Sequence, residues 1–328
     1  MKLRTSQAIE VLRAAGEPTR LRILALLARE ELAVLELCSV LDQSQPRVSR
    51  HLKLLAEAGL VERFPDGAWV FYRLSGDGPN LKGLAGDLVR EVLERVDPAD
   101  PVLTRDAERL HAVFAERASV ASDYFARNAA RWDEIRSLYV AEGDVEAAIL
   151  KAAGPGPFRR LVDLGSGTGR MLTLLGPRSQ GSLGLDLSQQ MLNIARNHVD
   201  EAGLKACELR HGDIFGTRLP DGEADLVVVH QVLHYLTDPA AAVSEAVRIT
   251  APGGKLLIVD FAPHRLEFLR EQHQHRRLGF SDAEIRRWVG GEAFGDLSVE
   301  TLPPARDAGL TVKIWTAERA AARQRTAA

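Results

Sequence analysis

A loop of alternate glycines between acidic residues is the feature of this sequence with the clearest chemistry. The apolar run 161–164, which includes Asp163, leads directly into Gly165-Ser-Gly167-Thr-Gly169, and a helical pattern follows at once. This order predicts a strand that enters a helix through a turn where side chains would obstruct a ligand. Asp186 ends the next apolar run, 21 residues after Gly165, at the distance where a carboxylate meets the ribose hydroxyls in a nucleotide site.

The glycine loop alone does not identify a ligand. Glycine turns between a strand and a helix occur in many folds, and a turn that binds nothing is the alternative. A dinucleotide site reads G-x-G-x-x-G, whereas the sixth position here is Arg170 and the pattern is G-x-G-x-G. Further acids follow at strand-like positions: Asp213, Asp225 and, after the turn 251–254, Asp260.

This ordered series resembles the class I S-adenosylmethionine-dependent methyltransferases over roughly residues 120–318. The resemblance implies an α/β, Rossmann-like domain with a mostly parallel seven-stranded sheet, and S-adenosyl-L-methionine as its cofactor. That cofactor is an activated cation, so in-line placement in a dry pocket lowers most of the barrier to methyl transfer. The cofactor-binding residues that the resemblance implies are Asp163, Gly165, Ser166, Gly167, Asp186, Leu187, Met191, Asp213, Ile214 and His230.

The same resemblance implies a role for several of these side chains. Asp163 would orient the loop and the cofactor's ammonium, Asp186 would accept the ribose hydroxyls, and Asp213 would accept from the adenine amine while Ile214 covers the ring. Met191 could pack on the adenine, although a methionine at helical spacing is equally expected in a plain core.

Three residues are candidates for contact with the methyl acceptor: His230, His234 and Tyr124. His230 would line the methyl-donor pocket. His234, four residues later, could act as general base or contact the substrate, although a satisfied structural histidine is the commoner outcome. Tyr124 belongs to segment 124–133, which resembles the lid helix of small-molecule methyltransferases. Tyr124 and Trp132 could close over the site and exclude water, or be buried against the domain.

A second set of histidines lies after the expected fifth strand: His264, His273 and His275. No nearby carboxylate spacing recurs, so we expect no metal site there. We expect these rings to face solvent or to line a substrate mouth.

In the amino-terminal part, one helix pattern is apolar on one face and basic on the other. Val48, Leu52 and Leu55 are spaced for burial, and Ser44 is expected as the N-cap, with Pro46 in the first turn. The opposite face has no acid between residues 43 and 56 and suits base edges and phosphates. Its polar and basic side chains are Gln45, Arg47, Ser49, Arg50 and Lys53.

A short helix before this one and a hairpin after it complete a winged helix-turn-helix. The hairpin is expected over 60–74 with its turn at 65–68, and Arg63 and Arg73 are placed to flank a DNA backbone. The alternative is a solvated charged helix in an ordinary helical subdomain.

Segments 17–20, 44–52 and 58–61 resemble the arsenic-repressor (ArsR/SmtB) family of winged-helix regulators, a match that covers about residues 5–96. The resemblance implies a double-stranded DNA operator as partner and a homodimer, paired through the helix expected over 80–96. Metal-sensing members carry Glu-Leu-Cys-Val-Cys where this sequence has Glu-Leu-Ala-Val-Leu at 31–35. One displaced thiol, Cys38, does not make a thiolate site, so we expect no metal.

Length and composition agree with this division. The chain has 328 residues, 45% of them hydrophobic, and a formal net charge of -3, which argues against bulk polyelectrolyte binding. The two cysteines, Cys38 and Cys207, support no disulfide framework, and a single thiol in the catalytic domain argues against an arsenite methyltransferase. Without an apolar run of ~20 residues or a signal peptide, we expect a cytoplasmic protein that does not enter the membrane.

We therefore expect three regions: 1–98, a winged helix-turn-helix for DNA binding and dimerisation; 99–150, a helical linker and lid; and 151–320, the methyltransferase domain. Together they predict a DNA-binding transcriptional regulator fused to a methyltransferase that acts on a small molecule. Two alternatives remain: a non-catalytic repressor that senses S-adenosylmethionine or S-adenosylhomocysteine, and an enzyme whose winged helix only dimerises it or recruits a protein.

Overall fold

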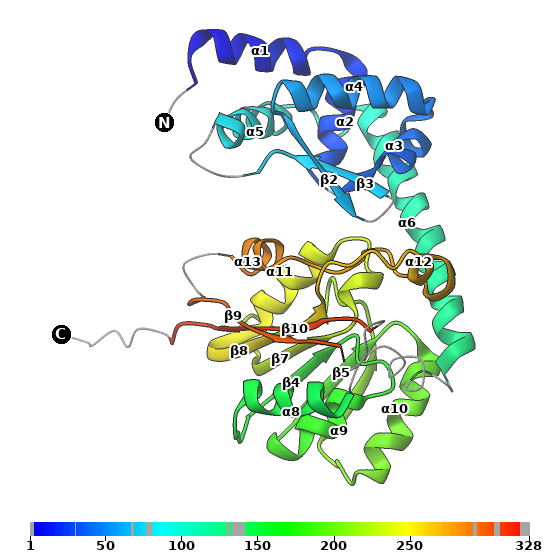
Figure 1. Cartoon of the computed structure of the whole chain (residues 1–328), viewed down its shortest axis with the longest axis vertical. Helices are drawn as coiled ribbons and strands as arrows, with labels where there is room; N and C mark the ends of the chain where they lie inside the picture. Colours follow the sequence, from blue (N-terminus) through cyan, green and yellow to red (C-terminus); the bar gives the residue numbers. More distant parts are fainter. Residues whose placement is uncertain are drawn as a thin grey trace, which may run out of the picture. The chain divides into compact units, whose positions relative to one another are not determined.

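The computed structural model describes residues 3–29, 31–66, 69–76, 81–129, 132, 142–290, 294–304 and 309–321. The chain divides into two compact units, Met1–Ser119 and Val120–Ala328, which are coloured along the sequence in Figure 1. The division falls inside helix α6 (Pro101–Asn128). The first part of α6 belongs to the amino-terminal unit, because Leu110 is buried in its core. The expected linker from residue 99 therefore begins as part of that unit.

The amino-terminal unit is mainly helical with a three-stranded sheet in the order β1-β3-β2. Before α6, its elements are α1 (Thr5–Ala15), α2 (Pro18–Leu27), β1 (Leu32–Ala33), α3 (Val34–Leu41), α4 (Gln45–Glu57), β2 (Val61–Asp66), β3 (Trp69–Leu74) and α5 (Leu81–Leu93). Helices α3 and α4 pack together, and β2 and β3 form the hairpin, as the sequence predicts. Strand β2 continues through Asp66, and residues 67–68 of the expected turn lie outside the described part.

Helix α4 is amphipathic for the expected reason. Val48, Leu52 and Leu55 are fully buried. Ser44 occupies the N-cap position with extended backbone, as predicted, but its side chain makes no capping hydrogen bond. Gly59 ends the helix with φ +71°, which lets the Leu60 N–H reach back to the Leu55 carbonyl at 2.9 Å.

The carboxyl-terminal unit is a seven-stranded sheet between two layers of helix, in the order β6-β5-β4-β7-β8-β10-β9. After α6, its elements are α8 (Glu142–Ala153), β4 (Leu161–Leu164), α9 (Arg170–Leu175), η2 (Gly176–Arg178), β5 (Ser182–Asp186), α10 (Gln189–Glu201), β6 (Cys207–His211), β7 (Ala224–His230), η3 (Leu233–Tyr235), α11 (Pro239–Ile249), β8 (Thr250–Phe261), α12 (Phe268–His273), α13 (Asp282–Val289), β9 (Ser298–Leu302) and β10 (Val312–Glu318). Strands β4 to β8 run parallel, and β10 is antiparallel to both neighbours. The predicted, mostly parallel seven-stranded sheet is confirmed.

Burial of strand β4 explains why Asp163 lies within an apolar run of the sequence. All four residues of β4 are buried: Val162 belongs to the cluster that includes α11, and Leu161 to the opposite one that includes α8 and α9. Figure 1 shows these helices on the two faces of the sheet. Because β4, β5, β7 and β8 are parallel, their carboxyl ends meet at one edge, where α/β sheets bind ligands. In the described ranges, no helix combines the length and the apolar character that crossing a bilayer requires.

Candidate functional site

The glycine loop between β4 and α9 has left-handed backbone at all three glycines. The φ angles are +73° at Gly165, +51° at Gly167 and +81° at Gly169. A Cβ at Gly165 would lie 2.6 Å from Val232 Cγ2, and one at Gly169 would lie 3.1 Å from Ala195 Cβ. The protein's own packing therefore opposes a side chain at Gly165, and at Gly169 a tight contact adds to the left-handed backbone. The sequence interpretation, based on ligand approach, did not contain this reason.

Gly167 is different, because among the described residues the nearest atom to a Cβ there would be Trp132 Nε1, at 3.8 Å. This glycine is the part of the loop whose side-chain space is not filled by backbone or core. It is also the part that Asp186 holds: the Gly167 N–H donates to Asp186 Oδ2 at 2.8 Å, and the Ser188 N–H donates to Oδ1 at 2.7 Å.

Asp186 thus stabilises the glycine loop and the start of α10 before any ligand binds. Each of its carboxylate oxygens keeps a lone pair that could accept a hydroxyl. Burial raises the pKa of Asp186, while the two backbone N–H groups and His211 oppose that rise. Its expected contact with ribose stays a prediction.

The other expected cofactor residues lie around the same sheet edge or on the loops after it. Asp163 and Ser166 are buried, with Asp163 between Gly184 of β5 and Val228 of β7. On α10 and the turn before it, Met191 is buried and Leu187 is exposed. Their expected contacts with adenine and ribose remain predictions.

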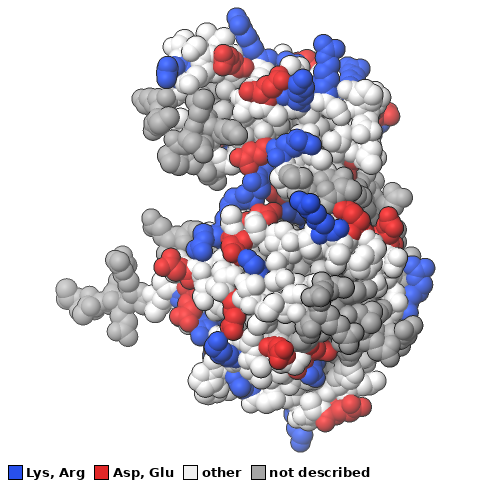
Figure 2. All heavy atoms as spheres, viewed as in Figure 1, with Lys and Arg blue, Asp and Glu red and all other residues white. Residues whose placement is uncertain are grey.

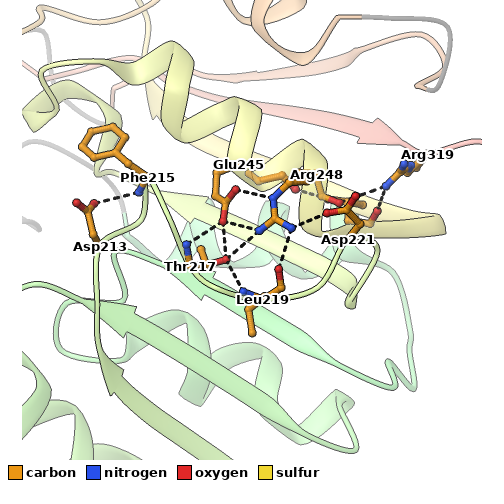
Figure 3. Close-up of polar contacts among 10 residues, drawn as sticks. Asp213, Phe215, Thr217, Leu219, Asp221, Glu245, Arg248 and Arg319 are labelled. Carbon is orange, nitrogen blue, oxygen red and sulfur yellow. Dashed lines mark hydrogen bonds and ion pairs between the residues drawn. The ribbon is translucent and has the colours of Figure 1, made fainter.

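The loop after β6 carries Asp213 and Ile214 and is fixed to α11 by a charged network (Figure 3). Glu245 accepts from the Thr217 backbone N–H at 2.8 Å and from its hydroxyl at 2.6 Å, and it pairs with Arg248 at 2.7 Å. Arg248 chiefly, and Thr217 in addition, lower the pKa of Glu245 to about 2 against the effect of burial. Asp213 itself is exposed and accepts from the Phe215 N–H at 3.0 Å, while Ile214 is buried.

A buried His–Asp pair lies where β7 and β8 end side by side. His234 Nδ1 is 2.7 Å from Asp260 Oδ1, and both side chains are almost fully buried. Because the carboxylate also accepts from the Phe261 N–H, it acts as an acceptor toward both groups. We therefore assign the imidazole proton to Nδ1, which makes Nε2 of His234 the nitrogen with the free lone pair of the ring.

Asp260 is the site residue that sequence reasoning missed. The signal was present, since Asp260 lies near the end of the strand next to the one that leads into His234. What the sequence does not contain is the register: His230 pairs with Val259, one residue before Asp260. His230, half-buried at the end of β7, stays a prediction for the methyl-donor pocket.

Aromatic side chains from the end of α6 contact rings that lie close to the His234–Asp260 pair. The Tyr124 hydroxyl lies 2.9 Å from His273 Nδ1, and the Phe125 ring is 4.8 Å from Tyr235 and 5.2 Å from Trp132. Burial raises the pKa of Tyr235 well above its usual value, and the nearby Tyr124 and Asp260 add to this effect. The segment that resembles a lid thus packs in the same aromatic cluster as the residue next to His234.

Of the two alternatives expected for the later histidines, exposure to solvent is wrong for His275, and a place at a substrate mouth stays a prediction. Its ring is buried, stacks on Phe261 with centroids 5.8 Å apart, and lies 4.2 Å from the His234 ring. Burial, and then the neighbouring His234, lower the pKa of His275, so it is neutral. The chain returns here because the Arg276 and Arg277 N–H groups donate to the His234 carbonyl.

The candidate nucleic-acid face of α4 is open to solvent. Its five expected contact residues, Gln45, Arg47, Ser49, Arg50 and Lys53, are all exposed. Figure 2 shows Lys and Arg side chains along the edge where Figure 1 places α4. Lys53 lies 3.9 Å from Glu57, a contact too exposed to hold it.

The two expected arginines of the hairpin differ. Arg63 is exposed. Arg73 donates to Glu62 at 2.9 and 2.7 Å and to Glu31 at 3.3 Å, and it covers the Phe64 ring. With two carboxylates already bound to it, Arg73 is less suited to a DNA phosphate than Arg63.

Neither cysteine takes part in a cluster of possible metal ligands; in the part of the chain that the structure describes, no three His, Cys, Asp or Glu side chains converge. Ala33 and Leu35 stand at the positions of the two cysteines of metal-sensing members: Ala33 pairs with Phe71 in the sheet, and Leu35 is exposed on α3. Burial raises the pKa of both Cys38 and Cys207.

Comparison with known proteins assigns both units. The family described as "Bacterial regulatory protein, arsR family" matches residues 17–63. The "Arsenical resistance operon repressor" of Escherichia coli (strain K12) is 44% identical over 84 residues, which are 25% of this chain and 69% of the repressor. The chain belongs to the arsR family. The family described as "Methyltransferase domain" matches residues 162–258, so this arsR-family chain is fused to a methyltransferase.

Relatives of the second unit agree. An uncharacterized methyltransferase, YcgJ of Bacillus subtilis (strain 168), is 24% identical over 196 residues, 57% of this chain and 77% of that protein. An arsenite methyltransferase of Aquipseudomonas alcaligenes is 30% identical over 182 residues, 46% of this chain and 51% of that protein. The fold of the N-methyltransferase NodS from Bradyrhizobium japonicum WM9, solved with S-adenosyl-L-homocysteine, matches with a TM-score of 0.51 at 17% identity, over 61% of this chain and 98% of NodS.

Proposed function

We propose that this arsR-family methyltransferase binds operator DNA as a homodimer and methylates a small molecule with S-adenosyl-L-methionine. One observation carries the catalytic part of the proposal. The His234–Asp260 pair stands at the same edge of the sheet as the glycine loop that Asp186 holds. A base and a nucleotide cradle at one edge are what a methyl transfer to an O–H or N–H group needs.

The residues present fit the cofactor. Gly167 has a bare backbone whose side-chain space is open to ordinary contact, and each oxygen of Asp186 retains a lone pair. The buried hydroxyl of Ser166 has no hydrogen-bond partner within the described ranges, so it is available to a polar group of a ligand. Asp163 would face the amino-acid part, Met191 and Leu187 the nucleoside, and Asp213 and Ile214 the adenine.

The cofactor, when bound, supplies an electrophilic methyl group on a sulfonium. The chain's own residues do the rest. His234 Nε2 would accept the proton that the acceptor's hydroxyl or amine group loses when its oxygen or nitrogen takes the methyl group. Asp260 keeps the His234 proton on Nδ1 and stabilises the imidazolium. Tyr124 and Trp132 exclude water, and His230 lines the pocket beside the donor.

One relative is named as an arsenite methyltransferase, so arsenite is a possible methyl acceptor to compare with the site. Trivalent arsenic binds thiolates, and Cys207 is the first residue of β6, opposite Ser182 at the start of β5. The candidate site lies at the carboxyl ends of these parallel strands, so Cys207 is at the wrong end of the sheet. An oxygen or nitrogen acceptor fits the base better.

For the regulatory part, we propose that α4 reads the operator through Gln45, Arg47, Ser49, Arg50 and Lys53. Apolar side chains on α1 and α5 support pairing of two copies: Ile9, Leu12 and Val92 are large, apolar and exposed, and α1 packs on α5. Two recognition helices then meet two half-sites.

The test is an Asp260→Asn variant, assayed with labelled S-adenosylmethionine and a panel of phenols and amines. Loss of the anchored tautomer should lower turnover about 100-fold or more and change the pH–rate profile, whereas calorimetric affinity for S-adenosylhomocysteine should stay the same. Asp225→Asn is the matched control, because Asp225 binds Arg159 at the opposite end of β7. Unchanged turnover and pH profile in Asp260→Asn would refute the base.

The sensor alternative gives a different result. A protein that binds S-adenosylhomocysteine, transfers no methyl to any acceptor in a metabolite extract, and changes its operator affinity on binding would be a non-catalytic repressor.

A further inference from the structure

The amino-terminal unit contains a pocket that the proposed function does not use. Its volume is about 390 Å³, within the range of small-ligand sites. Charged side chains dominate its lining: Arg22, Arg47, Arg105, Arg109, Asp42 and Asp106. They come from α2, from the turn between α3 and α4, from α4 and from the first part of α6.

One arginine and one aspartate of this pocket form a bidentate ion pair with each other. Arg22 donates through Nε and Nη2 to the two oxygens of Asp106, both at 2.6 Å, and the Asp106 side chain is buried. Such a bidentate pair is neutral overall and geometrically fixed. It forms a rigid part of the wall.

The remaining charges are unbalanced. Arg109 donates to the Val40 carbonyl at 3.2 Å and lies 3.6 Å from Asp42, whose side chain is 81% exposed and therefore largely solvated. Arg47 and Arg105 are exposed, and within the described residues neither guanidinium has a hydrogen bond or ion pair. Three guanidinium groups thus share one solvated carboxylate.

We propose that this pocket binds the phosphate groups of a ligand. Guanidinium forks match phosphate oxygens in bidentate geometry and stay charged at every physiological pH. Three convergent cations suit the two or more charges of a phosphorylated ligand better than the single charge of a carboxylate. Leu41 and Val102 add an apolar part of the lining for the rest of such a molecule.

Two sources supply this chemistry, a free phosphorylated metabolite and the DNA backbone. Arg47 belongs to the face of α4 that we assign to DNA, whereas Arg105 and Arg109 lie on α6, outside the helix-turn-helix. A free anion bound between the two helices would engage Arg47 and compete with DNA. The inference therefore uses the proposed DNA face but does not depend on the methyltransferase.

The experiment uses the full chain and inorganic pyrophosphate as probe, titrated calorimetrically at constant ionic strength against inorganic sulfate. We expect saturable binding of pyrophosphate that Arg105→Ala weakens tenfold or more. Arg29→Ala is the matched control, since Arg29 is an exposed arginine of the same unit that does not line the pocket. Equal melting temperatures of the variants exclude unfolding.

A mobility shift with duplex DNA from the chain's own promoter separates the two sources. If Arg105→Ala loses pyrophosphate and keeps its DNA affinity, a free phosphorylated molecule is the ligand. If it loses both to the same degree, the phosphate belongs to DNA. Pyrophosphate binding that is absent, or the same in Arg105→Ala and the unchanged protein, overturns the pocket. In that case, loss of DNA binding in Arg47→Ala would still support the proposed DNA face, so the failure of the pocket and the failure of the DNA face can be told apart.

Discussion

Replacing Gly165 by alanine tests whether the glycine loop is shaped by the protein's own packing. Two separate costs are expected. The residue has φ +73°, and a Cβ would lie 2.6 Å from Val232 Cγ2. Gly253 offers a matched control, because its φ is +78° and a Cβ there would meet nothing within 4 Å.

The magnitudes follow from this difference. Left-handed backbone costs an L-residue about 1–2 kcal/mol, which is the whole expected effect of Gly253→Ala. Overpacking adds about 1–3 kcal/mol at Gly165, so we expect Gly165→Ala to lower the free energy of unfolding by about 2–5 kcal/mol in total. Truncation of Val232 to alanine removes the contacts with Cγ2 and Cγ1, at 2.6 and 3.2 Å, and leaves the contact with Cβ at 3.1 Å. In that background, the cost of Gly165→Ala should fall toward the Gly253→Ala value.

The assay is urea unfolding of the four variants and of the unchanged protein, followed by tryptophan fluorescence, to which the fully buried Trp315 of the methyltransferase unit contributes. Calorimetry with S-adenosylhomocysteine reports on the loop itself, and its affinity should recover together with stability in the double variant. If Gly165→Ala costs no more than Gly253→Ala, or if Val232→Ala does not relieve it, contact with Val232 does not shape the loop.

Three further predictions concern single side chains. Arg50→Ala should weaken specific operator binding by about 1–3 kcal/mol if it reads a base edge, and an unchanged ratio of operator to random-DNA affinity in a mobility shift would contradict this. The pKa of Glu245 is about 2 in the folded protein and 4.5 in the unfolded chain. The carboxylate therefore stabilises the fold fully above pH 4.5, and this contribution is lost as the pH falls toward 2. The free energy of unfolding of Glu245→Gln should be lower than that of the unchanged protein by about 1–3 kcal/mol at pH 7, and a difference that does not shrink on acidification refutes the pairing. Because the pKa of Asp186 is raised, affinity for S-adenosylhomocysteine should decline on acidification from a higher pH than for an ordinary aspartate. Calorimetry should show no such decline in Asp186→Asn.

The fold was accessible from the sequence because its signals are local. Buried strands appear as apolar runs, the helix pattern of 45–57 has one apolar face, and glycines stand at 165, 167 and 169 where the backbone is left-handed. The mostly parallel seven-stranded sheet followed from the resemblance to a family, whereas its strand order was not predicted. The part of α6 that packs with the amino-terminal unit was not predicted, because the break at residues 97–101 looked like the end of that unit.

The site was only partly accessible, because its decisive contacts join distant segments. His234 was a candidate with a commoner structural alternative, and no local pattern connects it to Asp260, 26 residues later. The same holds for Val232 against Gly165, and for the Tyr124 hydroxyl at His273. Sequence motifs indicated which residue types belong to the site, whereas strand register and loop packing determine which of these side chains are in contact.

These distant contacts also bear on what kind of protein this is. A domain that only held S-adenosylmethionine would need the glycine loop and Asp186, both of which act on the cofactor side. It would have no use for a buried carboxylate that fixes the tautomer of a histidine, since burial of Asp260 costs free energy unless the charge is stabilised there. His234 and the Phe261 N–H supply that stabilisation, and they do so at the end of the sheet where an acceptor would lie. A structural pair serves stability wherever it stands in a fold; a pair at this edge, where the glycine loop that Asp186 holds also lies, favours catalysis over sensing.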